Sequence, residues 1–178
     1  MRRLFALAIL SAALAVPAHA QGLMADMHAD VADTQKKLID LAKAIPESAY
    51  GWRPGAGVRS VGEVLQHVAA DNYILPVYFG KAAPAATGIT KDYKTAVAYE
   101  TRKANKAAIV ADLEASFKHL HEGMNLLTDQ NIAGNIDWFG QPATRRKAIV
   151  STVTHLHEHL GQMIAYARSN GVKPPWSN

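Results

Sequence analysis

The sequence predicts an all-α fold of one domain, arranged as a four-helix bundle. Apolar residues recur with helical spacing in four segments of similar length, and no useful stretch between them alternates with the period of two that a strand requires. Glycine and proline mark the connections, and the chain has neither repeats nor long linkers. Helices with one apolar face bury it against one another, which favours a bundle.

The first 20 residues have the pattern of a signal peptide and are set aside from the fold. Arg2 and Arg3 precede a short apolar run, and 18–20 (Ala-His-Ala) has the small residues at which a signal peptidase cuts. The mature domain would then be residues 21–178, in the periplasm or secreted. A retained membrane anchor is the alternative, although this run is short for a bilayer span and no later segment is apolar for long enough.

The first predicted helix runs from about Leu23 to Ala44, and Pro46 follows its end. A loop rich in glycine and proline, 50–57, comes next. In the first predicted helix the apolar residues recur with helical spacing, so one face of this helix is expected to be buried. These residues are Leu23, Met27, Val31, Leu38, Leu41 and Ile45.

The second predicted helix begins at a capping box, in which Ser60 and Glu63 satisfy the free amides of the first turn. Pro76 is expected to bend or shorten it. After a connection at 81–90, residues 92–102 are equally compatible with a short helix and with an ordered loop.

A third long helix is predicted from about Lys106 to Leu127, with a regular apolar stripe. Residues 134–142 are expected to form a loop. Thr144 can cap the last helix, which continues to about Ser169, where Asn170-Gly171 offers a left-handed stop.

Composition and charge narrow the classes of function. With 19 basic and 15 acidic residues, the mature chain without Arg2 and Arg3 carries 17 against 15, and the basic residues are spread along it. This balance argues against nucleic acid as a partner. The chain has no cysteine, so any metal must be held by nitrogen and oxygen.

Two histidines of the last helix, His155 and His159, are four residues apart and therefore project from one face, one turn from each other. Imidazoles so placed can bind one metal ion together, although solvated histidines at this spacing are the ordinary alternative. A zinc-protease motif is excluded because position 156 is leucine where that motif has glutamate.

A third histidine, His67, lies at the border of the core face of the second helix and could meet this pair. Three imidazoles leave a coordination position open, which is typical of catalytic sites. Asp71, one turn after His67, could orient its ring or join the metal, or could be a surface carboxylate. Gln162, one turn beyond His159, could donate a hydrogen bond near the site.

The remaining histidines are assigned from helical geometry. His157 points away from His155 and His159 and is excluded, while His119 and His121 have polar neighbours and are expected to be solvated. His28 on the first helix could reach the site.

Three passages of the chain resemble DinB-like proteins of the DinB/YfiT superfamily: WRPGAGVRSVGEVLQHVAADNY, VADLEASFKHL and HLHEHLGQMIAYARSNGVKPPWS. The resemblance covers 23–178, and 159–162 (His-Leu-Gly-Gln) is typical of the family's last helix. It implies an antiparallel-type four-helix bundle whose metal ligands match His67, His155 and His159. It also implies zinc or nickel as the metal, often a homodimer, and either thiol transfer or hydrolysis.

These observations lead to three hypotheses of function. The first is an exported metal-dependent hydrolase or transferase that acts on a small molecule. The second is a metal-binding or ligand-binding protein of the cell envelope that acts in stress without turnover. The third is a bundle in which the ion only stabilises helix contacts, and three ligands in place of four make it the least attractive.

Overall fold

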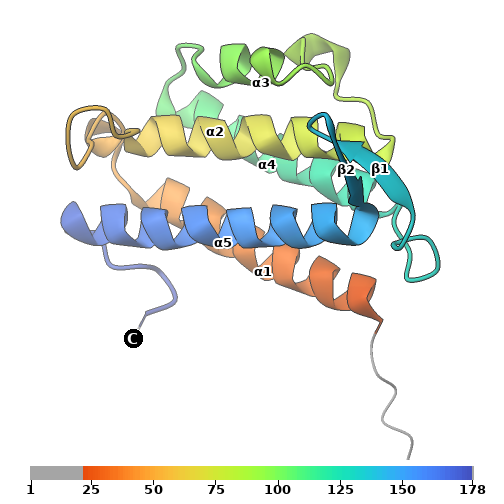
Figure 1. The fold of residues 1–178 in the computed structure, drawn as a ribbon. Helices are drawn as coiled ribbons and strands as arrows, with labels where there is room; N and C mark the ends of the chain where they lie inside the picture. Colours follow the sequence, from red (N-terminus) through yellow and green to blue (C-terminus); the bar gives the residue numbers. More distant parts are fainter. Residues whose placement is uncertain (1–21, 178) are drawn as a thin grey trace, which may run out of the picture.

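The computed structural model describes residues 22–177, and four of its helices form a bundle (Figure 1). The predicted all-α four-helix bundle is therefore confirmed. The predicted signal peptide lies outside the described residues, and within 22–177 no helix has both the length and the apolar character to cross a membrane. The bundle helices are α1 (Leu23–Ala44), α2 (Val61–Ile74), α4 (Lys106–Met124) and α5 (Arg145–Ser169).

The helices do not all alternate in direction. Figure 1 shows that α1 and α5 run one way and that α2 and α4 run the other way. Two contacts at helix ends agree: Lys106 at the start of α4 donates to the carbonyl of Ile45 after α1 (2.7 Å), and the Tyr166 hydroxyl near the end of α5 donates to the carbonyl of Arg59 before α2 (3.1 Å). The antiparallel arrangement implied by the resemblance thus holds for α1 with α4 and for α2 with α5, whereas the neighbours α1 and α5, and α2 and α4, are parallel.

The parallel pair α2 and α4 requires a long connection that returns the chain to its starting end. That connection contains the 3-10 helices η2 (Leu75–Phe79) and η3 (Ala85–Thr87) and the short helix α3 (Tyr93–Glu100), which packs on α2 (Figure 1). The segment 92–102, which the sequence left undecided, is therefore mainly helical. Asp92 caps α3 by accepting a hydrogen bond from the Lys94 amide (3.0 Å).

Helix α2 lies inside the molecule, covered by α3, α4 and α5, so nearly every one of its residues is buried. Polar side chains on this helix therefore need partners within the protein. The core around it is apolar, and its largest fully buried side chains include Phe117, Leu38, Leu41, Leu65, Leu113, Leu120, Met124 and Met163.

Most predicted helix boundaries are confirmed. The capping box of Ser60 and Glu63 is complete, Thr144 caps α5, and Gly171 has φ +71 just beyond that helix. The chain tightens into η2 at Pro76, as a proline in this position favours. Helix α4 ends at Met124, three residues before the predicted end.

The segment predicted as a loop at 134–142 was assigned wrongly, because it forms a β-hairpin. Strands β1 (Asn135–Trp138) and β2 (Gln141–Thr144) pair antiparallel, with Trp138 opposite Gln141. The turn residues Phe139 and Gly140 both have positive φ, +53 and +79. Each strand has four residues, too few for an alternating pattern to stand out.

Candidate metal centre

Three histidine rings from two helices converge between α2 and α5. One nitrogen from each of His67, His155 and His159 lies within 4.8 Å of the others. The Nε2 atoms of His155 and His159 are 3.0 Å apart, and the His67 ring centroid lies 5.3 Å from that of His155 and 4.8 Å from that of His159. The structure thus brings together the three residues that the sequence proposed as ligands.

Helical geometry explains this convergence. His155 and His159 stack on one face of α5 because they are four residues apart. His67 lies on α2, whose packing against α5 brings its ring against that pair. His67 is 5% exposed, so its imidazole faces the interior of the bundle.

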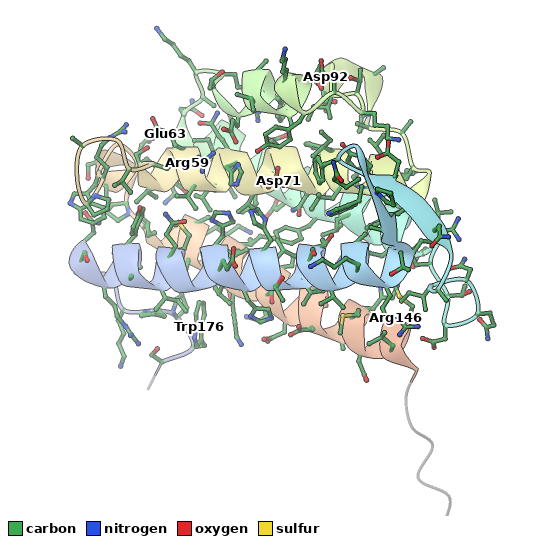
Figure 2. All side chains as sticks on the ribbon, in the orientation of Figure 1. Arg59, Glu63, Asp71, Asp92, Arg146 and Trp176 are labelled. Carbon is green, nitrogen blue, oxygen red and sulfur yellow. The ribbon has the colours of Figure 1, made fainter. Side chains whose placement is uncertain are left out.

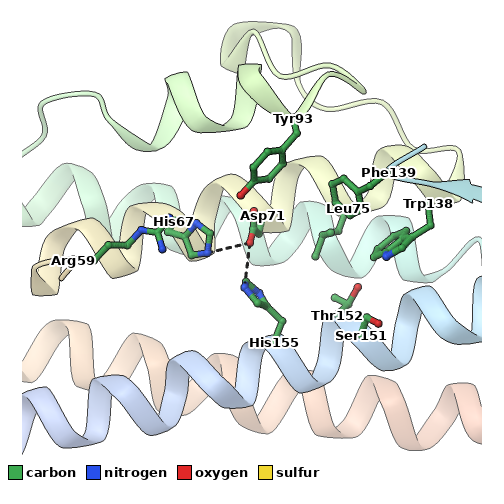
Figure 3. Close-up of a pocket in the computed structure, with 10 residues that line it drawn as sticks. All are labelled: Arg59, His67, Asp71, Leu75, Tyr93, Trp138, Phe139, Ser151, Thr152 and His155. Carbon is green, nitrogen blue, oxygen red and sulfur yellow. Dashed lines mark ion pairs between the residues drawn. The ribbon is translucent and has the colours of Figure 1, made fainter. Parts of the chain in front are cut away.

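Asp71 belongs to the same cluster and is not a surface residue. Its Oδ2 atom lies 3.4 Å from Nε2 of His67 and 3.5 Å from Nε2 of His155 (Figure 3). The residue is 8% exposed, and Figure 2 places it within the bundle whereas Asp92 and Trp176 lie at the periphery. The pKa of this carboxyl is raised to about 7, chiefly by burial and also by the nearby Glu100 carboxylate, against the opposing effect of Arg59.

Glu100 contacts the ring of His67 on the side that faces away from the other two histidines. Its Nδ1 lies 2.5 Å from Oε2 of Glu100, and the other oxygen of that carboxylate accepts from Arg59 at 3.0 Å. Nδ1 is thereby engaged, so Nε2 of His67 is the nitrogen that faces Asp71 and the other histidines. A carboxylate behind a histidine ring is the usual support for a metal ligand, because it fixes the ring and its tautomer.

His159 is supported in the same way from its own helix. Its Nδ1 lies 2.9 Å from Oε1 of Gln162, so this amide accepts a hydrogen bond where the sequence suggested a donor. The amide nitrogen of Gln162 in turn donates to the Tyr166 hydroxyl (2.9 Å), which donates to the carbonyl of Arg59. Nε2 of His159 is therefore the atom presented to His155.

All three imidazoles are held in the neutral form that binds metals. The pKa of His155 is lowered to about 4, chiefly by burial and also by the neighbouring His159, His67 and Arg59. Burial also lowers the pKa of His67 and of His159, against the opposing hydrogen bonds from Glu100 and Gln162. A neutral imidazole keeps a lone pair for an ion at neutral pH.

The spacing of these atoms fits one divalent ion. Two ligands at zinc-ligand bond lengths in a tetrahedral site are about 3.4 Å apart. Here Nε2 of His155 and of His159 are 3.0 Å apart, and Asp71 lies 3.4 and 3.5 Å from His67 and His155, while the nitrogens of the three histidines lie within 4.8 Å of one another. Imidazole nitrogens and a carboxylate oxygen accept several divalent ions, so the donor set does not identify the metal.

The other histidines lie apart from this cluster. His157 is exposed and contacts Asp30 at 3.0 Å, in agreement with its exclusion, and His28 stacks on His121 and does not reach the site. The expectation that His119 is solvated was wrong, whereas His121 keeps part of its surface in solvent. His119 is 5% exposed beside the Tyr73 ring, and His121 is half-buried.

Sequence reasoning missed Arg59 and Glu100. Glu100 lies 33 positions after His67, at the end of α3, in a segment without a clear apolar pattern. Arg59 lies in a loop whose glycines and prolines indicate only turns. An acidic residue near the end of a short helix gives no signal of its own, so only the packing of α3 on α2 reveals this pair.

A cavity of about 500 Å³ opens beside the cluster (Figure 3). Arg59 lies beyond His67 at one end, and aromatic side chains stand at the other. Its lining consists of Arg59, His67, Asp71, Leu75, Tyr93, Trp138, Phe139, Ser151, Thr152 and His155. The cluster is therefore accessible to a small molecule.

Comparison with known proteins gives one family. Residues 31–163 match the model of the DinB superfamily. Solved structures with the same fold include a DinB-like protein from Bacillus cereus (17% identity, 89% of this chain and 99% of that chain, TM-score 0.70). Another DinB-like protein, from Bacillus subtilis, is 16% identical over 83% of this chain and 93% of its own (TM-score 0.62).

A third similar structure is YfiT from Bacillus subtilis, described as a probable metal-dependent hydrolase with an unusual four-helix bundle topology. It is 17% identical and covers 88% of this chain and 94% of its own, with a TM-score of 0.63. No curated protein matches the chain. At these identities the likeness establishes the fold.

Proposed function

Because the chain belongs to the DinB superfamily, we propose that it holds one divalent metal ion on His67, His155 and His159 and uses it to hydrolyse a small molecule or to transfer a group from it. The observation that carries this proposal is the convergence of three neutral imidazoles and a carboxylate at the wall of an open cavity. The description of YfiT as a probable metal-dependent hydrolase supports the same reaction class.

Each residue of the cluster has a defined task in this proposal. A divalent ion supplies Lewis-acid chemistry, which polarises a carbonyl or lowers the pKa of a water. Glu100 and Gln162 hold the rings of His67 and His159 in orientation from behind. Asp71 places a carboxylate oxygen at the mouth of the cluster, where it can accept a proton from a nucleophile.

Binding without turnover is the second candidate, and the position of Asp71 favours it. Oδ2 of Asp71 lies as close to two of the histidines as a fourth ligand would. Four protein ligands would close the coordination sphere, as in structural sites. The protein would then bind metal, or sense it, in the cell envelope.

We further propose that the protein works in the periplasm or outside the cell. The support is the pattern of residues 1–20, with two arginines, a short apolar run and the small residues of a cleavage site. Expression of the full chain with detection of the mature N-terminus tests this proposal. A protein that retains Met1 and stays in the cytoplasm contradicts it.

The metal site is tested by elemental analysis of the purified mature protein and by titration with zinc. One bound ion per chain is expected, and alanine variants of His67, His155 and His159 should each lose it while the helical circular dichroism remains. His157→Ala is the matched control, because that histidine lies on α5 but faces Asp30. Equal zinc binding by His67→Ala and His157→Ala would refute the site.

Turnover is tested separately with metal-loaded protein and a panel of small esters, amides and thiol adducts. Hydrolysis or transfer that disappears in His67→Ala supports the enzyme. Stoichiometric zinc binding with no reaction across the panel supports the second candidate. Activity that survives in His67→Ala contradicts the metal-dependent mechanism.

A further inference from the structure

The cavity beside the histidine cluster has a wall of aromatic side chains. Tyr93 comes from the start of α3, and Trp138 and Phe139 come from the tip of the hairpin (Figure 3). The ring centroids of Phe139 lie 4.9 Å from Trp138 and 5.8 Å from Tyr93, at steep angles of 79° and 81°. Two elements that are distant in sequence, α3 and the hairpin, thus line the cavity with aromatic rings, and Trp138 and Phe139 stand at the end away from Arg59.

Phe139 occupies a backbone position that its residue type disfavours. Its φ of +53 lies in the left-handed region, and among residues 22–177 it is the one residue other than glycine with positive φ. A two-residue hairpin turn in which both φ values are positive favours Asn-Gly, whereas here the pair is Phe139-Gly140. A bulky side chain in this conformation is strained, and such strain is concentrated at functional sites.

Two of the aromatic side chains that line the cavity are exposed and not buried in the core. Phe139 is 40% exposed and Tyr93 is 43% exposed, although both belong to the largest apolar side chains of the molecule. The Phe139 ring does contact Tyr78, at a centroid distance of 4.5 Å, so packing within the protein accounts for one part of its surface. Phe139 also lines the cavity beside the histidine cluster, where an apolar group of a ligand can reach it.

The opposite end of the cavity is suited to a different kind of group. With a divalent ion in place, the ion and Arg59 together carry more positive charge than the carboxylates of Asp71 and Glu100 carry negative charge. This end therefore favours an anionic or strongly polarised oxygen. His67 on α2 and Leu75, the residue that directly follows this helix, both line the cavity, and eight residues at helical rise correspond to a length of about 12 Å.

We infer that the ligand of this centre is a small molecule with an oxygen donor at one end and a planar aromatic group at the other, and that Phe139 on the hairpin tip binds the aromatic group. This inference rests on the proposed metal centre. It adds the chemical class of the substrate and names a binding residue, Phe139, whose ring is partly exposed at the cavity and whose backbone conformation its residue type disfavours. Trp138 and Tyr93 complete the aromatic surface.

The test compares two metal-directed probes, acetohydroxamate and benzohydroxamate, which share a head group and differ in the aromatic ring. Their affinities are measured by calorimetry on the zinc-loaded mature protein, on Phe139→Asn and on Phe139→Tyr. Leu126→Asn is the matched control, because it removes another exposed apolar side chain (46% exposed) that does not line this cavity. Melting temperatures are recorded for every variant.

The wild-type protein is expected to prefer benzohydroxamate, and Phe139→Asn should reduce that preference about fivefold, because one aromatic contact is lost. Acetohydroxamate should bind both proteins equally. The melting temperature of Phe139→Asn should stay close to that of the wild type. Asparagine is favoured in this turn and relieves its strain, which offsets the loss of the ring contacts of Phe139. Phe139→Tyr and Leu126→Asn should keep the wild-type preference.

Other outcomes separate this inference from the metal site. An unchanged preference in Phe139→Asn, or an equal loss for both probes, overturns the aromatic site and leaves the metal centre standing. If neither probe binds the zinc-loaded protein better than the zinc-free protein, the proposed function itself fails. Should Phe139→Asn melt far below the wild type, Phe139→Gly, which also tolerates positive φ, replaces it in the same comparison.

Discussion

Replacement of Asp71 by asparagine should change how stability depends on pH in the metal-free protein. The Asp71 carboxyl has a pKa of about 7 in the folded protein, chiefly because it is buried, against 3.8 in the unfolded chain. Between these values the folded protein binds a proton that the unfolded chain releases. The stability that this group contributes is therefore present at low pH and is lost as the pH rises through 7.

The size of the effect follows from the width of that window. Between pH 5 and pH 8 the wild type should lose about 3 kcal/mol of unfolding free energy through this group, since each pKa unit corresponds to about 1.4 kcal/mol. Asp71→Asn keeps the shape of the side chain and cannot ionise. The variant should therefore gain about 3 kcal/mol relative to the wild type over the same range.

His155 acts in the opposite direction. Its pKa is about 4 in the folded protein against 6.5 when unfolded, so its contribution falls as the pH drops from 6.5 toward 4. Because both proteins contain His155, its contribution cancels in the difference between them. The comparison of Asp71→Asn with the wild type thus measures the carboxyl together with its coupling to the two histidines that it contacts, His67 and His155.

The assay is urea unfolding with a chelator present, followed by far-UV circular dichroism at several pH values. Saturating zinc should reverse the order of stability at pH 8, because the ion favours the ionised carboxylate. Parallel stability curves for the two metal-free proteins would refute the buried, proton-binding state of Asp71.

Three further predictions concern the support of the site and the packing of the bundle. Glu100→Gln should weaken zinc binding about tenfold in calorimetry, because the partner of His67 loses its charge, whereas the exposed Glu114→Gln should leave it unchanged. Gly123→Ala should lower the melting temperature, because the new Cβ would lie 2.5 Å from a side-chain atom of Pro76. In contrast, the new Cβ of Gly161→Ala meets nothing within 4 Å, so this variant should raise the free energy of unfolding by about 0.5–1 kcal/mol. Addition of a chelator to the zinc-loaded protein should lower its melting temperature, and a shift that the triple histidine-to-alanine variant also shows would contradict a specific site.

The sequence was sufficient for the bundle helices because their signals are local. The apolar period, the capping box at Ser60, Thr144 at the start of α5 and Gly171 after its end each involve a few neighbouring residues. The spacing of His155 and His159 is local in the same sense. The approach of His67 to that pair depends on packing, and family resemblance supplied what spacing alone could not.

The sequence predictions that were wrong or missing have a common physical cause, because each depends on tertiary packing. His119 was expected in solvent because of its polar neighbours, but Tyr73 on α2 and the surrounding helices bury it. The hairpin escaped notice because its strands are short and half-buried. Glu100 and Arg59 were missed because a side chain that acts on a residue of another element leaves no mark in the local pattern.

The distribution of the histidines along the chain limits when a metal can be acquired. His67 lies on α2, while His155 and His159 lie on α5, so the ligands come from helices that are far apart along the chain. A chain emerging from the ribosome or crossing a membrane in an extended state therefore has no complete set of ligands until its final helix is free and docked on α2. An ion that needs all three histidines can therefore be bound only after α5 has docked on α2.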